Sequence, residues 1–402
     1  MSPLPLTNSC LILPNELINN PFTYNGMSKH LLSIASILLL TYTACLACTS
    51  AIVSGRLTAN GRPLMWKHRD TGEQNNRIER VKAHDGLFEF VALFDARDSK
   101  DSAAWIGFNE RGFAIMNTAS YNLKDDNVPD SQMDREGVVM RYALERCATV
   151  ADFERVLEQL PKPLGVEANF GVMDADGNAA YFETNNYKWT KFDLADEPSG
   201  ILIRTNYSVS GRKDEGMGYI RFENATELLR PHIVAADITP ATFTEELSRT
   251  FYNSKLNRNY NKSYPQWIVD QDYIPRSSST ASIVIEGIAV GEPANLTVMW
   301  SALGYPPCAE VVPCFLGEGG VPQELTGSLP NRHSIQSDRV LARKAEVFPV
   351  KRGNGKRYIN FSKLYNHSKT GYCQVLSQKN AETYRTGYAE IERRRARLNK
   401  RK

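Results

Sequence analysis

A cysteine follows directly after a short apolar segment near the start of the chain. Cys48 comes after Cys45-Leu46-Ala47, so small residues occupy the third and first positions before it. This spacing is typical of a signal-peptide cleavage site, and cleavage after Ala47 would make Cys48 the new N-terminus. A free N-terminal cysteine combines a thiol of pKa about 8.5 with an amine of pKa about 7.7–8.0. Because the amine can take the proton of the thiol, the residue is predicted to be a nucleophile for acyl transfer.

The segment before Cys48 has the composition of a signal peptide. It starts at Met27 and has an apolar stretch over 31–40. Residues 1–26 lack a basic region of the kind that begins such peptides, so we expect translation to start at Met27 and the signal peptide to cover 27–47. The predicted location is therefore the periplasm or the cell exterior, in free or membrane-anchored form.

A second interpretation gives this region no catalytic role. Lipidation of Cys45 or Cys48 would make the chain an exported lipoprotein that serves as a binding module. Both sites fit poorly, because Tyr42 and Cys45 stand where an aliphatic residue is expected. Lipidation of Cys48 would also block its amine and exclude the predicted chemistry.

The composition is that of a globular protein, with 42% apolar and 23% charged residues. Only four of the seven cysteines come after Cys48, which excludes a dense disulfide framework, although Cys308 and Cys314 flank a short loop and could pair in an oxidising compartment. The six histidines show no metal-ligand spacing. No recognition motif supports binding to a nucleic acid.

The end of the chain is basic. Residues 380–402 hold eight Lys or Arg against three Glu, a local charge of +5 in a chain of net charge +3. We expect a solvated terminal helix here; the alternative is a contact of this tail with a membrane surface.

The hydrophobic pattern predicts strands, then helices, then strands again. Paired apolar stretches predict hairpins that turn at 60–61, 109–112 and 176–178. Helical periodicity covers 134–160 and returns at 216–229. This order predicts an α+β domain of layered sheets covered by helices. The predicted organisation is a leader at 1–47, a main domain at 48–350 and a loosely attached extension with a basic helical tail at 351–402.

Four stretches after the cysteine form a pattern in their order and spacing. They are KHRD at 67–70, GFNERGFAIMNTASYN at 107–122, LIRTNYS at 202–208 and GYIRFENATELL at 218–229. Together with Cys48 they resemble the cysteine N-terminal-nucleophile hydrolases, which include choloylglycine hydrolases, penicillin V acylases and acyl-CoA:6-aminopenicillanate acyltransferase-type enzymes.

The first stretch supplies charged groups around the thiol. The resemblance makes Asp70 the carboxylate that holds the free α-amine against the thiol of Cys48. Lys67 stands where the family has an arginine; as a cation it could lower the pKa of the thiol, but it lacks the bidentate fork. Arg69 could take over this role, although on a strand it would face the opposite side from Asp70.

The other stretches supply the remaining site residues that the resemblance implies. Asn206 is expected to be the main amide donor to the oxyanion, with Asn117 as a second ligand on the same side. Arg221 is expected to complete a charged network with Asp70 beneath the nucleophile.

The resemblance also implies the fold and the reaction. The expected fold is a four-layer αββα sandwich of two stacked antiparallel sheets between helices. The expected reaction is hydrolysis of a linear amide through a thioester, or transfer of the acyl group to another amine, with no metal or organic cofactor and in a homo-oligomer. Bile-salt, penicillin-type and other N-acyl amide substrates all stay open.

Overall fold

The computed structural model describes residues 47–124 and 127–400 of the chain. The predicted signal peptide, apart from Ala47, lies outside the described residues. No helix among those described is both long and apolar enough to span a membrane.

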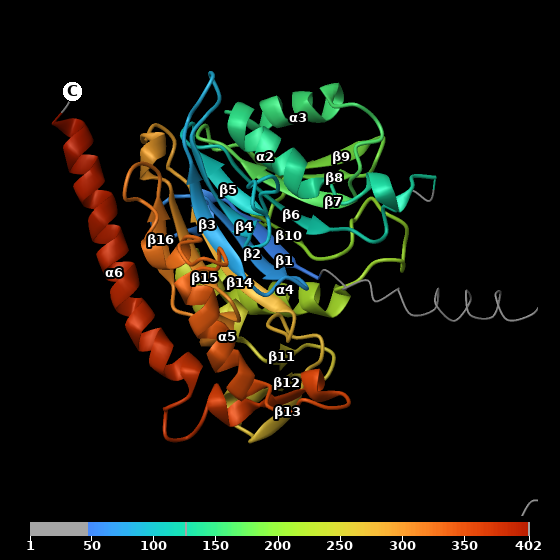
Figure 1. Cartoon of the computed structure of the whole chain (residues 1–402), viewed down its shortest axis with the longest axis vertical. Coiled ribbons are helices and arrows are strands. Elements are labelled where there is room, and N and C mark those ends of the chain that lie inside the picture. The colour runs from blue at the N-terminus through green and yellow to red at the C-terminus, as the bar shows by residue number, and fades with distance from the viewer. Residues whose placement is uncertain (1–46, 125–126, 401–402) are drawn as a thin grey trace, which may run out of the picture. The chain divides into compact units, whose positions relative to one another are not determined.

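Two antiparallel sheets stack face to face, and helices cover both outer faces (Figure 1). The first sheet has six strands, in the order β10 (Ile201–Arg204), β1 (Thr49–Val53), β2 (Leu64–Asp70), β14 (Ser279–Glu286), β15 (Val298–Leu303) and β16 (Val312–Phe315). The second sheet has seven strands in chain order, β3 (Asn76–Val81), β4 (Phe90–Asp95), β5 (Ile106–Asn109), β6 (Ala114–Ala119), β7 (Ala168–Met173), β8 (Ala179–Thr184) and β9 (Trp189–Asp193).

Helices form the two outer layers. The second sheet is covered by α2 (Glu136–Arg146) and α3 (Val150–Gln159), and the first by α4 (Tyr219–Ala235), α5 (Ile335–Val347) and α6 (Tyr372–Asn399). Two short ribbons complete the described structure, β11 (Tyr252–Asn253) with β12 (Arg258–Asn259), and β13 (Trp267–Val269) with β17 (Tyr358–Asn360).

The side chains of each strand alternate between two apolar cores. In β1, Ile52 faces the second sheet, whereas Ala51 and Val53 face the helices. In β7, Phe170 and Val172 face α2 and α3. Because both sheets are buried on both faces, central strands such as β4 and β7 are almost continuously apolar. The four-layer αββα architecture predicted from the resemblance is confirmed.

At one end of the central strands of the first sheet, residues from distant parts of the chain lie close together. β1 pairs with β2, so that Thr49 lies opposite His68, and with β10, so that Ser50 lies opposite Arg204. β14 pairs with β2, so that Ser279 lies opposite Asp70. The start of β1, the end of β2, the end of β10 and the start of β14 therefore meet at this end.

The C-terminal region differs from the prediction of a loosely attached extension. α6 packs across the first sheet, where Tyr384 lies 4.8 Å from the ring of Trp300 and Ile391 is buried. Its arginines pair with acids of the same helix, as in Arg393–Glu390. Because α6 buries only a narrow stripe, its polar and basic composition conceals the packing.

The pairing of Cys308 with Cys314 that the sequence left open is absent. Both are free and buried, and Cys314 lies in β16 with its Sγ 3.9 Å from the hydroxyl of Ser301.

Candidate active site

Cys48 lies directly before the first residue of β1, at the end where the four strands meet. Its side chain is buried, and its Sγ is 4.0 Å from the backbone carbonyl oxygen of Asp70. The antiparallel pairing of β1 with β2 fixes this proximity, because Thr49 and His68 are directly opposite. The thiol and the predicted carboxylate residue are therefore neighbours, as the sequence pattern implies.

The carboxylate of Asp70 is buried and held from two directions. Oδ1 accepts a 2.6 Å hydrogen bond from the hydroxyl of Ser279, and Oδ2 accepts one of 2.6 Å from Nη2 of Arg276. The same Nη2 lies 3.4 Å from the carbonyl oxygen of Ala47. A buried carboxylate needs a paired cation and further hydrogen bonds, and both are present. Asp70 is thus fixed beside the peptide bond that joins Ala47 to Cys48.

His68 supports this arrangement as a neutral group. Its Nε2 lies 2.8 Å from the hydroxyl of Ser279, and its Nδ1 lies 3.2 Å from that of Ser248. Burial lowers the pKa of His68 to about 4, more strongly than the nearby Asp70 raises it. The imidazole is therefore uncharged at neutral pH and orients the hydroxyl that binds Asp70.

Arg221 connects the nucleophile to Asn206. Its Nη1 donates to the carbonyl oxygen of Cys48 at 2.5 Å and to the hydroxyl of Thr49 at 2.9 Å, while Nη2 donates to Oδ1 of Asn206 at 2.8 Å. Burial lowers the pKa of Arg221 to about 10, so the group stays cationic at neutral pH. The charge of Asp70 acts on Arg221, and the cation hydrogen-bonded to the Asp70 carboxylate is Arg276.

The position of Asn206 follows from a closed loop between β10 and α4. Met217 N donates to the carbonyl oxygen of Asn206 at 3.1 Å, which brings the start of α4 back to the end of β10. The amide Nδ2 of Asn206 donates to the carbonyl oxygen of Ala119 at 2.9 Å. The predicted amide donor and Arg221 are therefore adjacent, as expected.

Lys67 and Asn117 form a second buried group. The Lys67 Nζ donates to Oδ1 of Asn117 and to the carbonyl oxygen of Trp105, both at 2.7 Å. Burial lowers the pKa of Lys67 to about 7, although the charge of Cys48 acts in the opposite direction. Because Lys67 holds the carbonyl end of the Asn117 amide, the NH₂ end of that amide is turned away from the lysine.

Arg69 does not take over the position of the expected arginine. Its Nη2 forms an ion pair with Oδ1 of Asp95 at 2.8 Å, its Nη1 donates a hydrogen bond to Asn76, and its guanidinium lies 4.9 Å from the ring centre of Trp105. These partners belong to or follow strands of the second sheet, whereas Asp70 bonds Ser279 and Arg276. The alternation of β2 therefore separates Arg69 from Asp70, as strand geometry predicts.

Sequence patterns missed Arg276 and Ser279. Arg276 lies in the segment before β14, and its contact with Asp70 spans 206 residues of chain. No local motif marks such a pairing, because it depends on β14 lying next to β2.

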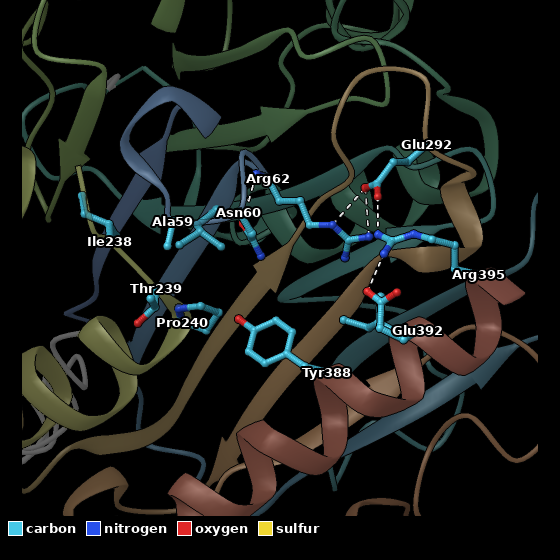
Figure 2. Close-up of a pocket in the computed structure, with 12 residues that line it drawn as sticks. Ala59, Asn60, Arg62, Ile238, Thr239, Pro240, Glu292, Tyr388, Glu392 and Arg395 are labelled. Atoms are coloured by element: carbon cyan, nitrogen blue, oxygen red, sulfur yellow. Dashed lines mark hydrogen bonds and ion pairs between the residues drawn. The ribbon is translucent and has the colours of Figure 1, made fainter.

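A separate cavity of about 470 Å³ lies at the far end of the same sheet (Figure 2). It is lined by the turn between β1 and β2 and by α6, and an ionic row of Arg62, Glu292, Arg395 and Glu392 crosses it. None of the predicted site residues lines this cavity.

Part of the chain matches a family of known proteins. Residues 104–267 match the family described as acyl-coenzyme A:6-aminopenicillanic acid acyl-transferase. No curated protein sequence matches the chain.

Solved structures with a similar chain path include three hydrolases. A Caenorhabditis elegans N-acylethanolamine-hydrolyzing acid amidase ortholog is 13% identical (60% of this chain, 92% of that chain, TM-score 0.38). Penicillin V acylase from Agrobacterium tumefaciens is 14% identical (67% and 87%, TM-score 0.37), and a variant of the conjugated bile acid hydrolase from Clostridium perfringens is 11% identical (64% and 89%, TM-score 0.37).

The αββα architecture and the family match over residues 104–267 both support the resemblance to the N-terminal-nucleophile hydrolases.

Proposed function

We propose that this protein hydrolyses linear N-acyl amides with Cys48 as an N-terminal nucleophile, after the residues before Cys48 have been removed. The observation that carries the proposal is the position of Cys48. It stands at the head of a central strand, its carbonyl oxygen is bound by Arg221, and its thiol lies beside Asp70. Penicillin-type amides, conjugated bile salts and other N-acyl amides are the candidate substrates.

The reaction begins with proton transfer within one residue. The free α-amine of Cys48, oriented by Asp70, takes the proton of the thiol. The thiolate then attacks the amide carbonyl, and a tetrahedral oxyanion forms. Arg276, bonded to both Asp70 and the carbonyl oxygen of Ala47, lies where the new amine would appear after cleavage. Its ion pair therefore holds the Asp70 carboxylate in place.

Asn206 and Asn117 are the proposed amide donors to the oxyanion. Arg221 and Lys67 each hold the carbonyl end of one of these amides, so both amides have a fixed orientation. Loss of one such donor typically lowers the rate by about 10²–10³-fold.

Two steps complete the reaction. The protonated amine of Cys48 gives its proton to the leaving amine as the C–N bond breaks, and the acyl group stays on sulfur as a thioester. Water then hydrolyses the thioester and restores the thiol. If a second amine takes the place of water, the same site acts as an acyltransferase, which is the activity that names the matching family.

The decisive test is the intact mass of the exported protein together with thiol alkylation. We expect a mature chain that begins at unmodified Cys48, rapid labelling by iodoacetamide, and turnover in a panel of N-acyl amides. The Cys48→Ala variant should lose both the labelling and the turnover. Burial raises the pKa of Cys314 to about 12, so Cys314→Ala serves as the matched control and should keep both.

Two results would contradict the proposal. A lipid adduct on Cys48 would favour the lipoprotein interpretation, since the amine would be blocked. A mature chain that retains residues before Cys48, with undiminished turnover, would exclude the N-terminal mechanism.

A further inference from the structure

An apolar face of the ribbon formed by β13 and β17 is exposed to solvent. Val269 pairs with Tyr358, and the inward side chains Ile268 and Ile359 are buried. The other face carries Trp267, Val269 and Tyr358, which are 42%, 42% and 46% exposed, beside the half-buried Asn360. A ribbon that packs on one face normally carries polar residues on the other. We call these three residues the outer ribbon face.

A basic loop precedes β17. Its four cations are exposed, and in the described part of the chain none of them forms an ion pair with a carboxylate. The loop is anchored beside the ribbon, because the carbonyl oxygen of Arg357 accepts a 2.6 Å hydrogen bond from Asp270 N at the end of β13. The members of this basic loop are Lys351, Arg352, Lys356 and Arg357.

Charge is concentrated around this ribbon. Segments 250–271 and 348–371 contain nine Lys or Arg and one acidic residue, Asp270, which gives a formal charge of +8. The whole chain has a net charge of +3, which leaves −5 for all other residues. The ribbon is therefore one of two basic regions of the chain, the other being residues 380–402. Two of the nine cations around the ribbon, Lys255 and Lys363, pair with Glu223 and Glu346.

We propose that the outer ribbon face and the basic loop dock this protein on an anionic lipid surface. Trp and Tyr favour the boundary between headgroups and acyl chains, because their rings are apolar and carry one polar group. Lys and Arg are attracted to an anionic leaflet within about one Debye length. A nucleic acid would use the same cations, but it would leave Val269 and the 40% exposed Val350 without an apolar partner.

This surface differs from the C-terminal tail that the sequence suggested. Arg393 and Arg395 in α6 pair with Glu390 and Glu392, which reduces the charge that the helix presents. The basic loop has no such compensation. The ribbon region is therefore the stronger candidate for the membrane contact.

The docking surface is connected to the candidate active site by a short segment. Oδ2 of Asp270 accepts a 3.0 Å hydrogen bond from Ser277 N, and the preceding residue, Arg276, binds Asp70. An amphipathic amide drawn from the bilayer would enter on this side, a consequence that rests on the proposed function, whereas the docking itself does not.

Vesicle sedimentation of the full mature protein tests the docking. We expect binding to phosphatidylcholine vesicles that contain phosphatidylserine, no binding to vesicles of phosphatidylcholine alone, and weaker binding as salt is added. A Trp267→Ser/Tyr358→Ser variant and a Lys356→Glu/Arg357→Glu variant should each bind at least about tenfold more weakly. The matched control Arg393→Glu/Arg397→Glu, on exposed positions of α6, should bind like the unchanged protein.

Tryptophan fluorescence gives a second readout. Trp267 is more exposed than the other four tryptophans, two of which are fully buried. Anionic vesicles should shift the emission to the blue, and Trp267→Phe should remove most of the shift. Unchanged binding by the Trp267→Ser/Tyr358→Ser variant, or lost binding by the α6 variant alone, would overturn the proposal.

The vesicle-binding experiments can fail or succeed independently of the experiments that test the proposed amide hydrolysis. Vesicle binding needs no substrate, and the ribbon variants should hydrolyse a water-soluble N-acyl amide at an unchanged rate. A protein that binds vesicles without turnover would refute the proposed function alone. A protein with turnover that ignores anionic vesicles would refute the docking alone.

Discussion

Three cations lie close to Cys48, and they differ in how they respond to pH. Arg221 and Arg276 are guanidinium groups, and the pKa of Arg221, although lowered by burial, is still about 10. Lys67 is an ammonium group whose pKa burial lowers to about 7. The positive charge on the Lys67 side of Cys48 therefore disappears at a pH where the two arginines keep theirs.

The pH dependence of Cys48 alkylation should report this difference. Lys67 is charged below about pH 7 and neutral above it, so it favours the thiolate mainly on the acidic side. Lys67→Met should slow alkylation roughly tenfold near pH 6, where Lys67 is charged, and have little effect near pH 8.5. Lys67→Arg keeps its charge and should speed alkylation near pH 8.5. The measurement is the rate of iodoacetamide labelling across this pH range. Identical profiles for the three proteins would show that Lys67 does not act on the thiol.

The elements around Asn206 depend on a glycine at the start of α4. Gly218 precedes the helix with a φ of 87°, a conformation that side chains other than glycine rarely adopt. A Cβ here would collide with the guanidinium of Arg221 and lie 2.8 Å from the hydroxyl of Thr205. Gly218 therefore allows Arg221 to reach both Asn206 and Cys48.

Gly218→Ala should lower the rate of amide hydrolysis more than its effect on stability explains. The positive φ should cost about 1–2 kcal/mol of folding free energy. Gly291→Ala is the matched control, because Gly291 has a φ of 89° and a Cβ there would meet nothing within 4 Å. Gly218→Ala should lose at least as much stability as Gly291→Ala by urea denaturation, but only Gly218→Ala should lose activity, by up to about a hundredfold at saturating substrate. Equal activity in the two variants would disprove the role given to Gly218.

Turn residues and hydrophobic periodicity in the sequence correctly predicted helices and hairpins that form within one stretch of chain. The hairpin turning at 60–61 and the helix expected at 216–229 are present as β1–β2 and α4, because turn residues and helical periodicity act over a few residues. The alternation of β2 correctly separated Arg69 from Asp70. Arg276 could not be predicted, since its place beside Asp70 depends on β14 pairing with β2 across more than 200 residues.

For the whole molecule, the C-terminal helix is part of the main core. Tyr384 packs on Trp300 and its hydroxyl bonds Thr244. Gly387 lies against the Trp300 ring, where a Cβ would overlap the ring atoms, so the helix can approach the sheet closely. Composition alone suggested a solvated tail because most of α6 is polar, and its narrow buried stripe carries little hydrophobic signal.

Gly387→Ala should destabilise the protein although alanine is the better helix former. The substitution gains about 1 kcal/mol in helix propensity but overpacks the Trp300 contact at a cost of about 1–3 kcal/mol. Thr386→Ala, at an exposed position of the same helix, should be neutral or stabilising by a few tenths of a kcal/mol. Urea midpoints of the two variants decide the matter. An increased urea midpoint for Gly387→Ala would mean that α6 does not pack closely against Trp300 at this position.

The long separations within the site also bear on how the protein is made. Ala47 and Arg276, which lie in contact, are 229 residues apart, and Cys48 is 173 residues before Arg221. At about 5–20 residues per second, a ribosome needs roughly 10–50 seconds to add the chain between Ala47 and Arg276. During that time Cys48 lacks the side chains that surround it in the folded protein. The last of these, Arg276 and Ser279, are added only after about two thirds of the 402 residues have been synthesised.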